Sequence, residues 1–391
     1  MQSSRGNGLQ LEGKQPRVIA VIAVVTAAVA LPASGADGPN RASTPPGAAR
    51  VRIGAYWWDG WFEGSPYIRP PLTTEFKGRE PQWGWRDDNQ QAVDESIRLA
   101  ADYGIDFFAF LWYPPDAWRF PNGQPSDVMN NGLRFFLASQ EPQRRSVGFL
   151  LMITHAPSKD EWEPACRRWV QEYLVHDRYV RVADKPALFF YELSELDAKL
   201  GGRERVRPAL DRLRQNARQE KGLELFLVLR AQRDESHALA ELGFDGATDY
   251  AVAYAPTPGE HPYHELVSAG MQVWSGYEGR RAHYIPSITA GWDGRPRAWM
   301  GKEHYRYWYR RSPTEFGAFV RRGLDWLLYH PQEAAPEPLL MIYAWNEIDE
   351  GGAICPTKQD GPAYLQALQD AVSSILPSAT RPQASPASTT R

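Results

Sequence analysis

Short apolar segments alternate with amphipathic segments along most of the chain, from residue 51 to residue 375. The apolar segments are rich in Val, Ile, Leu and Phe and are bounded by polar residues, a pattern typical of strands buried on both faces. The pattern predicts eight strands, at residues 51–58, 105–113, 147–154, 186–191, 223–231, 244–250, 284–291 and 338–345.

The amphipathic segments between these strands predict helices. In residues 87–104, Val93, Ile97, Ala100 and Ala101 fall on one helical face, and Gly104 marks the helix end. Further helices are expected near residues 128–139, 161–176, 203–221, 235–242, 263–269, 314–330 and 362–375. Eight strands that alternate with eight helices predict a single-domain (β/α)8 TIM barrel of the α/β class. An open doubly wound sheet is the alternative, but no G-x-G-x-x-G element follows the first strand.

The two ends of the chain differ from this pattern. Residues 1–36 have basic residues, then an apolar run at 18–31, then the small residues Ser34 and Ala36, as in a cleaved signal peptide. We therefore expect a secreted or periplasmic protein without a stable membrane partner after cleavage, although an uncleaved anchor is an alternative. Residues 37–50 are expected to be a linker, residues 51–376 the catalytic domain and residues 377–391 a disordered tail.

Composition narrows the classes of partner. The formal net charge of −3 and a pI near 6.3 give no basic patch for nucleic acid. The two cysteines, Cys166 and Cys355, could pair in an exported chain, but Cys166 lies among apolar residues at helical spacing, which favours a buried free thiol. No Cys, His or Asp cluster has metal-ligand spacing, so neither a metal nor another cofactor is expected.

Polar and aromatic residues collect where the predicted strands end, which is where TIM barrels place their sites. Aromatic rings there can stack on sugar faces, and polar groups can bind hydroxyls; core packing, helix capping or a structural salt bridge remains open for each. The candidate substrate-binding residues are Trp57, Trp58, Asp59, Trp112, Tyr113, His155, Tyr191, Arg230, Tyr250, Trp292, Asp293 and Asn346.

The eighth strand ends in the sequence YAWNEIDEGG, residues 343–352, which crowds three carboxylates. Gly351 and Gly352 favour a turn, in which Glu347 and Glu350 could converge on one cavity. Glycoside hydrolysis needs two carboxyl groups, and crowding them raises one pKa, which yields a proton donor beside a base. These two glutamates are therefore the candidate catalytic residues, with a solvated acidic loop as the alternative. Asp349 is expected to face solvent or to bind nearby backbone.

Three segments resemble a known family. The sequence NEIDEGG resembles the Asn-Glu-x-x-Glu-Gly motif of glycoside hydrolase family 99, the endo-α-mannosidases, and of related TIM barrels from polysaccharide biosynthesis. Residues 83–113 and 287–297 resemble the opening and the seventh-strand element of that family. The family normally has Trp-His between the two glutamates, where this chain has Ile348 and Asp349, so the substrate stays open.

Together with the predicted signal peptide, the resemblance implies an exported, retaining glycoside hydrolase that acts within α-linked, mannose-like oligo- or polysaccharides. It implies that Glu347 acts as the base on the sugar 2-hydroxyl, through an anhydrosugar, and that Glu350 donates the proton to the leaving oxygen. Two alternatives from other classes remain. One is a transferase-like protein of polysaccharide biosynthesis, and the other is a non-catalytic glycan-binding barrel. The presence of both glutamates disfavours the second.

Overall fold

A computed structural model describes residues 50–115, 117–119, 125–231, 235–302 and 305–375. The predicted signal peptide (1–36), the predicted linker (37–50, apart from Arg50) and the predicted tail (377–391) lie outside the described residues. Within the described part of the chain, no helix is long and apolar enough to cross a membrane.

Parallel strands pair with one another in a ring. In order around the ring they are β1 (Arg52–Trp57), β2 (Phe107–Trp112), β5 (Gly148–Ile153), β7 (Lys185–Phe190), β8 (Phe226–Arg230), β9 (Gly246–Thr248), β11 (Tyr284–Ile285), β12 (Ser287–Thr289) and β14 (Leu339–Tyr343). β14 then pairs with β1, with Arg52 opposite Leu339.

The seventh strand position consists of two short pieces, because Pro286 lies between β11 and β12 and has no N–H to donate. β11 pairs with β9, and β12 pairs with β14. The carbonyl of Pro286 still accepts a hydrogen bond from the amide of Met341 at 2.9 Å. The segment therefore joins β9 to β14 and completes the TIM barrel that the sequence predicts.

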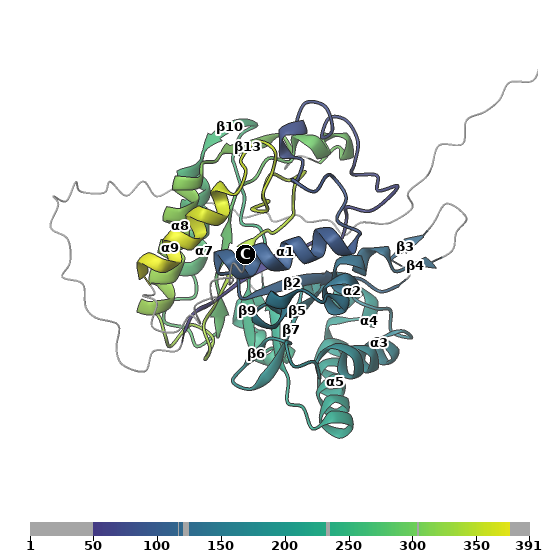
Figure 1. The fold of residues 1–391 in the computed structure, drawn as a ribbon. Helices are drawn as coiled ribbons and strands as arrows, with labels where there is room; N and C mark the ends of the chain where they lie inside the picture. Colours follow the sequence, from purple (N-terminus) through teal and green to yellow (C-terminus); the bar gives the residue numbers. More distant parts are fainter. Residues whose placement is uncertain (1–49, 116, 120–124, 232–234, 303–304, 376–391) are drawn as a thin grey trace, which may run out of the picture. The chain divides into compact units, whose positions relative to one another are not determined.

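Helices follow the strands around the barrel, and Figure 1 shows α7, α8 and α9 on one side with α2, α3 and α5 on the other. They are α1 (Gln90–Tyr103), α2 (Asn131–Ala138), α3 (Trp162–Arg168), α4 (Leu193–Leu200), α5 (Val206–Lys221), α6 (Leu239–Leu242), α7 (Tyr263–Ser275), α8 (Pro313–Tyr329) and α9 (Ala363–Ile375). In α1, the side chain of Asn89 caps the amide of Ala92, and Gly104 ends the helix with a φ of 84°. The predicted helices are present, and α4 is an addition.

Two loops at the carboxyl ends of the strands are tied together. β10 (Gly259–Pro262), from the loop after β9, pairs in parallel with β13 (Tyr307–Arg310), from the loop after β12. Two smaller features are the hairpin of β3 (Trp118–Arg119) with β4 (Pro125–Ser126), and β6 (Arg181–Val182), which pairs with β7. The β10–β13 pair holds the long loop that follows β12, which carries part of the site described below.

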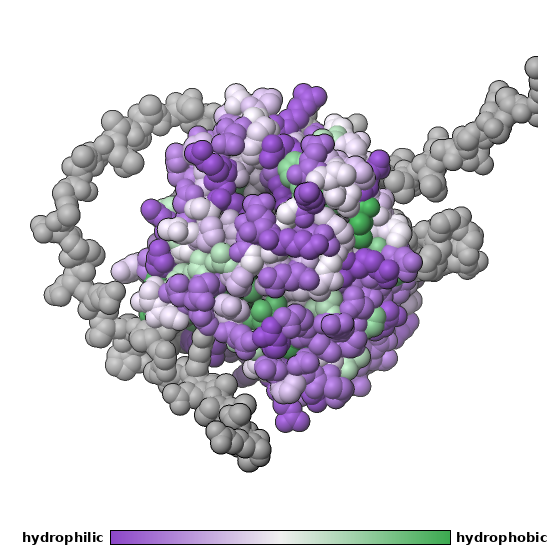
Figure 2. Space-filling model, turned by 45° about the horizontal axis from the view of Figure 1, so that its top comes forward, coloured by the Kyte–Doolittle hydropathy of each residue, from purple (hydrophilic) through white to green (hydrophobic). Residues whose placement is uncertain are grey.

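The core fills both faces of the strands. Every residue of β2 is buried, as expected for a parallel strand covered by helices. Cys166 and Cys355 are both buried and free, which confirms the predicted thiols. The surface in Figure 2 is mostly hydrophilic, with hydrophobic residues in small separate groups. The large hydrophobic side chains exposed among the described residues are Val175, Tyr254, Met271, Trp299 and Tyr329.

Candidate active site

The turn after β14 points its carboxylates inward. The amide of Gly352 donates to the carbonyl of Glu347 at 3.0 Å, and Gly351 has a φ of 70°, in the left-handed region that glycine tolerates best. The side chains of Glu347 and Glu350 are therefore buried, with residue exposures of 4% and 8%. This burial rules out the alternative of a solvated acidic loop.

The prediction that Asp349 faces solvent is wrong, because its residue exposure is 1%. Arg297 explains how a third carboxylate can be buried here. The guanidinium of Arg297 donates through Nε to Asp349 at 2.5 Å, through Nη2 to Glu347 at 3.2 Å, and through Nη1 to Glu350. A buried charge needs a partner of opposite sign, and Arg297 supplies one cation to three acids.

Arg297 was missed as a candidate, although it closes the stretch 287–297 that carries the family resemblance. It lies in the 3-10 turn Arg295–Met300, in the loop that follows β12. Its guanidinium also lies over the rings of Trp58, at 4.8 Å, and Tyr67, at 5.0 Å. A buried cluster of acids needs a cation nearby. This requirement is the one signal in the sequence that could have led to an arginine as a site residue.

Tyrosines complete the hydrogen bonding of the two glutamates. The hydroxyl of Tyr250 donates to Oε1 of Glu347 at 2.6 Å. The hydroxyl of Tyr343 donates to Oε2 of Glu350, and that of Tyr305 donates to Oε1 of Glu350 at 3.4 Å. Tyr343 is the last residue of β14, and Glu350 lies in the turn that follows this strand. The hydrogen bond between them therefore ties the turn to the end of the strand.

The electrostatics of the cluster favour one retained proton. Burial and the neighbouring charge of Glu350 raise the pKa of Glu347 to about 8. Burial also raises the pKa of Asp349. Burial alone would lower the pKa of Arg297, but the carboxylates of Asp349 and Glu350 raise it well above its usual range. Three acids and one guanidinium carry a net negative charge if all are ionised, and a proton on Glu347 reduces it.

Several predicted residues do gather around this cluster. Tyr250 contacts Glu347 directly, and its ring lies 5.2 Å from that of Tyr191 and 4.8 Å from that of Tyr343. Trp58 lies against Arg297. Trp292 lies 6.4 Å from the ring of Tyr343.

Three more predicted residues lie at the edge of this group. Tyr113 is buried, and burial together with the charge of Glu347 raises its pKa. Arg230 lies 4.5 Å over the ring of Tyr191 and donates to the carbonyl of Tyr191 at 2.7 Å. Asp293 forms ion pairs with Arg79 and Arg295, and its amide donates to the carbonyl of Glu350 at 2.6 Å. Asp293 therefore fixes the loop rather than presenting a free carboxylate.

Four predicted residues are structural instead. Trp57 and Trp112 are buried in the core, with exposures of 0% and 1%. Asp59 accepts hydrogen bonds from Nε1 of Trp57 and from the amide of Gly132, both at 2.9 Å, and so joins β1 to α2. The amide side chain of Asn346 bonds the N–H and the carbonyl of Trp58, both at 2.8 Å, and is wholly buried. These hydrogen bonds join parts of the barrel to one another, so the contacts observed for Asp59 and Asn346 are structural.

His155 lies apart from the carboxylates. Its ring is 5.0 Å from that of Tyr113, and burial lowers its pKa to about 4. It is therefore a neutral, half-buried ring at physiological pH. Among the described residues, no group of His, Cys, Asp and Glu side chains could hold a metal ion.

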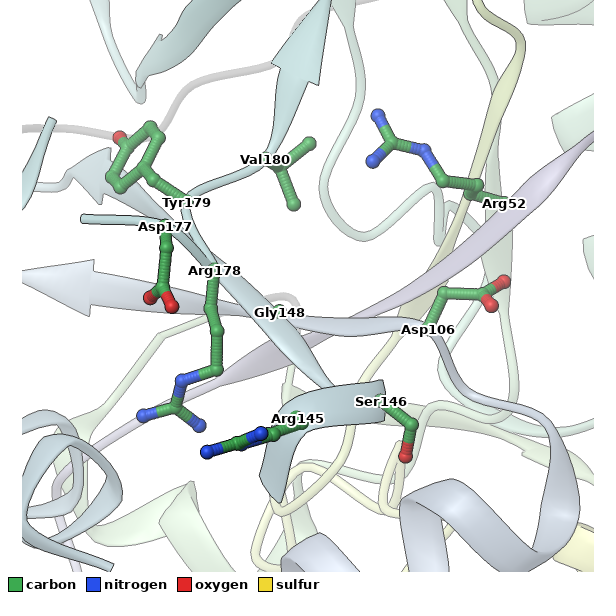
Figure 3. A pocket seen from close by; sticks show the side chains of 9 residues that line it. All are labelled: Arg52, Asp106, Arg145, Ser146, Gly148, Asp177, Arg178, Tyr179 and Val180. Carbon is green, nitrogen blue, oxygen red and sulfur yellow. The ribbon is translucent and has the colours of Figure 1, made fainter. Parts of the chain in front are cut away.

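A cavity of about 560 Å³ lies at the opposite end of the strands, where β1 and β5 begin. Figure 3 shows Arg145 and Arg178 on one side of it and Arg52 on the other. Arg178 donates to the carbonyl of Arg144 at 2.9 Å, and Arg52 donates to the carbonyl of Arg181. TIM-barrel sites lie at the carboxyl ends of the strands, so we assign this cavity to the stabilising face of the barrel.

Comparison with known sequences identifies relatives of this chain. The family model described as glycosyltransferase WbsX matches residues 84–368. The uncharacterized protein WxcX of Xanthomonas campestris pv. campestris, strain ATCC 33913, is 27% identical over 347 residues, which cover 81% of this chain and 47% of that protein. The chain thus spans about half the length of this curated relative.

Solved structures of glycoside hydrolases share the barrel. The family 99 endo-α-mannosidase of Bacteroides thetaiotaomicron, in complex with bis-tris-propane, has a TM-score of 0.56 at 13% identity, covering 84% of this chain and 98% of that one. A glycoside hydrolase-like protein has a TM-score of 0.55 at 15% identity, covering 82% and 93%. At such low identity the likeness shows the fold alone, which is a TIM barrel.

Proposed function

We propose, from the premise that the chain belongs to the glycosyltransferase WbsX family, that it is an enzyme that acts on glycosidic bonds of oligo- or polysaccharides through Glu347 and Glu350. In its specific form, the proposal is a retaining glycoside hydrolase that cuts within α-linked, mannose-like chains. The observation that carries it is the pair of buried glutamates at the carboxyl end of β14, bridged by the guanidinium of Arg297.

The two carboxyl groups have different environments, as acid and base partners require. Glu347 has a pKa raised to about 8 by burial and by Glu350, so it carries a proton at neutral pH. Glu350 accepts hydrogen bonds from Arg297, Tyr343 and Tyr305, and Glu347 accepts them from Arg297 and Tyr250. From the raised pKa we infer that Glu347 is the proton donor and that Glu350 is its partner in the reaction.

This assignment reverses the roles that the family resemblance implies, in which Glu347 is the base on the 2-hydroxyl and Glu350 the acid. The two assignments require opposite protonation states of Glu347, so the pH dependence of the reaction separates them. In both, one guanidinium binds the two carboxyl groups, and retention of configuration is what the family resemblance implies.

The aromatic residues at the same end of the barrel support a sugar substrate. Trp58, Tyr191, Tyr250 and Trp292 bring apolar ring faces and polar edges to the carboxylates. A sugar has one apolar face and a rim of hydroxyls, which such walls can bind while they exclude bulk water from the reacting bond.

A transferase is the second candidate, and the description of the family model favours it. The same two glutamates would then pass the sugar to an acceptor hydroxyl instead of water. A non-catalytic glycan-binding barrel is disfavoured, because it would have no use for buried, paired acids that cost stability.

Product analysis separates these candidates. Wild-type protein would be incubated with α-mannan and with α-linked manno-oligosaccharides, with and without a sugar nucleotide, and the products separated by length. We expect shorter products with new reducing ends, and their loss in Glu347→Gln and Glu350→Gln. Products longer than the substrate that depend on the sugar nucleotide would instead identify a transferase, and unchanged cleavage by either variant would exclude these glutamates.

Export completes the proposal. It rests on the sequence of residues 1–36 alone. Amino-terminal sequencing of protein isolated from outside the cytoplasm would be expected to begin at Asp37. An intact amino terminus on cytoplasmic protein would contradict export and favour the transferase, since sugar-nucleotide donors are usually cytoplasmic.

A further inference from the structure

A row of aromatic rings leads from the surface to the carboxylates. Trp299 is 38% exposed, and its ring lies 6.3 Å from that of the half-buried Tyr67. The ring of Tyr67 lies 4.7 Å from that of Trp58, and the guanidinium of Arg297 lies against both. Because Arg297 bonds Glu347 and Glu350, the row connects the exposed indole of Trp299 with the reacting groups.

A second guanidinium lies at the outer end of this row. Arg69 is exposed, and its guanidinium lies 4.8 Å over the ring of Trp299. Within the described ranges, the side chain of Arg69 forms no ion pair, in contrast with Arg79 and Arg295, which both bind Asp293. A guanidinium stacked on an indole keeps its edges open for the two oxygens of a carboxylate.

The surrounding loop is rich in basic residues although the chain as a whole is acidic, and the arginines at 295, 297, 310 and 311 are paired with acidic side chains. The formal net charge of the chain is −3. Residues 293–311 nevertheless contain two acidic residues, Asp293 and Glu303, against six basic residues, which are Arg295, Arg297, Lys302, Arg306, Arg310 and Arg311. Because these four arginines are paired, the exposed guanidinium of Arg69 is the group that meets an anionic ligand at this end of the row.

We propose that Trp299, Tyr67 and Arg69 form an outer subsite that binds a carboxylate-bearing sugar, a uronic acid residue, of the polysaccharide on which the enzyme acts. The sugar stacks on the indole of Trp299, and its carboxylate pairs with the guanidinium of Arg69. The next residues of the chain then follow Tyr67 and Trp58 toward Glu347 and Glu350. This inference rests on the proposed function for its substrate, but it concerns binding, which is measured without turnover.

The experiment is affinity electrophoresis of the full-length protein in gels that contain polymannuronate, polygalacturonate or hyaluronan, and in gels that contain the same polymers after reduction of their carboxyl groups. We expect at least one acidic polymer to retard the wild-type protein more than its reduced form does. Arg69→Gln should weaken binding to that acidic polymer about five-fold and leave binding to the reduced polymer unchanged. The difference between Arg69→Gln and wild type should shrink at high salt, because exposed charges are screened.

Each variant of the proposed subsite has a control variant, in which a similar exposed side chain is replaced elsewhere on the barrel. Arg134 is an exposed arginine that lies 5.0 Å over Phe135 on the surface of α2, and Arg134→Gln should behave as wild type. Trp299→Ala should weaken binding to both forms of the polymer, whereas Tyr329→Ala, at a ring that is 79% exposed at the end of α8, should not. Thermal melts of all four variants check that each is folded.

The outcomes separate this inference from the proposed function. Loss of acid-polymer binding in Arg69→Gln supports the subsite even if no polymer is cleaved, in which case only the hydrolase proposal fails. Equal binding of acidic and reduced polymers by the wild type overturns the subsite, even if one of the polymers is cleaved. Equal effects of Arg69→Gln and Arg134→Gln also overturn it.

Discussion

The Nε of Arg297 donates a hydrogen bond to Oδ2 of Asp349 at 2.5 Å, and both side chains are buried. This contact orients the guanidinium, so that its two terminal nitrogens reach Glu347 and Glu350. Asp349 accepts from the nitrogen nearest the arginine stem, whereas the two glutamates accept from the terminal nitrogens. We therefore regard Asp349 as a positioning residue for the pair that performs the chemistry.

Asp349→Asn tests this positioning role. The variant leaves the Arg297 charge with one partner fewer, so it should lower the free energy of unfolding by about 3 kcal/mol in urea denaturation. It should also lower kcat about ten-fold with little change in KM, since the binding walls stay in place. Asp360→Asn is the control, because Asp360 forms a looser, partly exposed pair with Arg311 at 3.5 Å. An Asp349→Asn variant as stable and as active as Asp360→Asn would refute the positioning role.

The pH dependence of kcat/KM tests which glutamate holds the proton. The pKa of Glu347 is raised to about 8, and kcat/KM reports ionisations of the free enzyme. If Glu347 is the proton donor, kcat/KM should fall as the pH rises through about 8. A rise of kcat/KM through the same pH would instead support Glu347 as the base. Stopped assays on a cleaved oligosaccharide give this profile.

The same ionisation affects stability. The folded protein holds a proton on Glu347 that the unfolded chain, with a carboxyl pKa near 4.5, has lost above that pH. Stability from this group is therefore complete below pH of about 4.5 and declines as the pH rises to about 8. Glu347→Gln cannot lose this proton, so its stability relative to wild type should increase over that range. Urea denaturation at several pH values measures the difference, and a constant difference would argue against the raised pKa.

A substitution of Asn346 tests whether its side chain stabilises the fold or binds the substrate. Its side chain bonds both backbone groups of Trp58 and a carboxylate oxygen of Asp87, so removing it strands buried polar groups. Asn346→Ala should lower the free energy of unfolding by about 3 kcal/mol. Asn216→Ala, which removes one hydrogen bond to Glu163 from the half-buried side of α5, should cost less than about 1 kcal/mol. Equal stability losses in the two variants would contradict the supporting role.

The cysteines give a simple check of the core. Cys166 and Cys355 are buried free thiols, and burial raises the pKa of each. Native protein should therefore react with a thiol reagent only very slowly, and unfolded protein should release two equivalents of thiol without prior reduction. Detection of a disulfide in the unfolded, unreduced protein would contradict this arrangement.

The strands and helices could be predicted because their signals are local. The eight apolar segments coincide with the observed barrel strands, and Asn89 and Gly104 mark the ends of α1 as caps do. Glu347 and Glu350 could be found because a dense acidic motif ends an apolar strand.

The arrangement of the rim could not be predicted to the same extent. Neighbouring strand residues face opposite sides, so Trp57 packs against Phe108, outside the barrel interior, while Tyr56, which was not a candidate, lies 4.8 Å from the ring of Tyr250. Arg297 lies about fifty residues before the acids it binds, in a loop whose conformation no local pattern determines. Asp349 is buried because Arg297 binds it. The sequence does not reveal this contact, so the sequence alone predicted an Asp349 side chain exposed to solvent.

The most direct test of the central claim compares the rates of five proteins on one cleaved glycan: wild type, Glu347→Gln, Glu350→Gln, Asp349→Asn and Asp360→Asn. We predict that each glutamine variant loses activity by about a thousand-fold or more, that Asp349→Asn loses about ten-fold, and that Asp360→Asn matches wild type. Folded Glu347→Gln or Glu350→Gln protein with the activity of Asp360→Asn would contradict the claim that these two buried glutamates perform the chemistry.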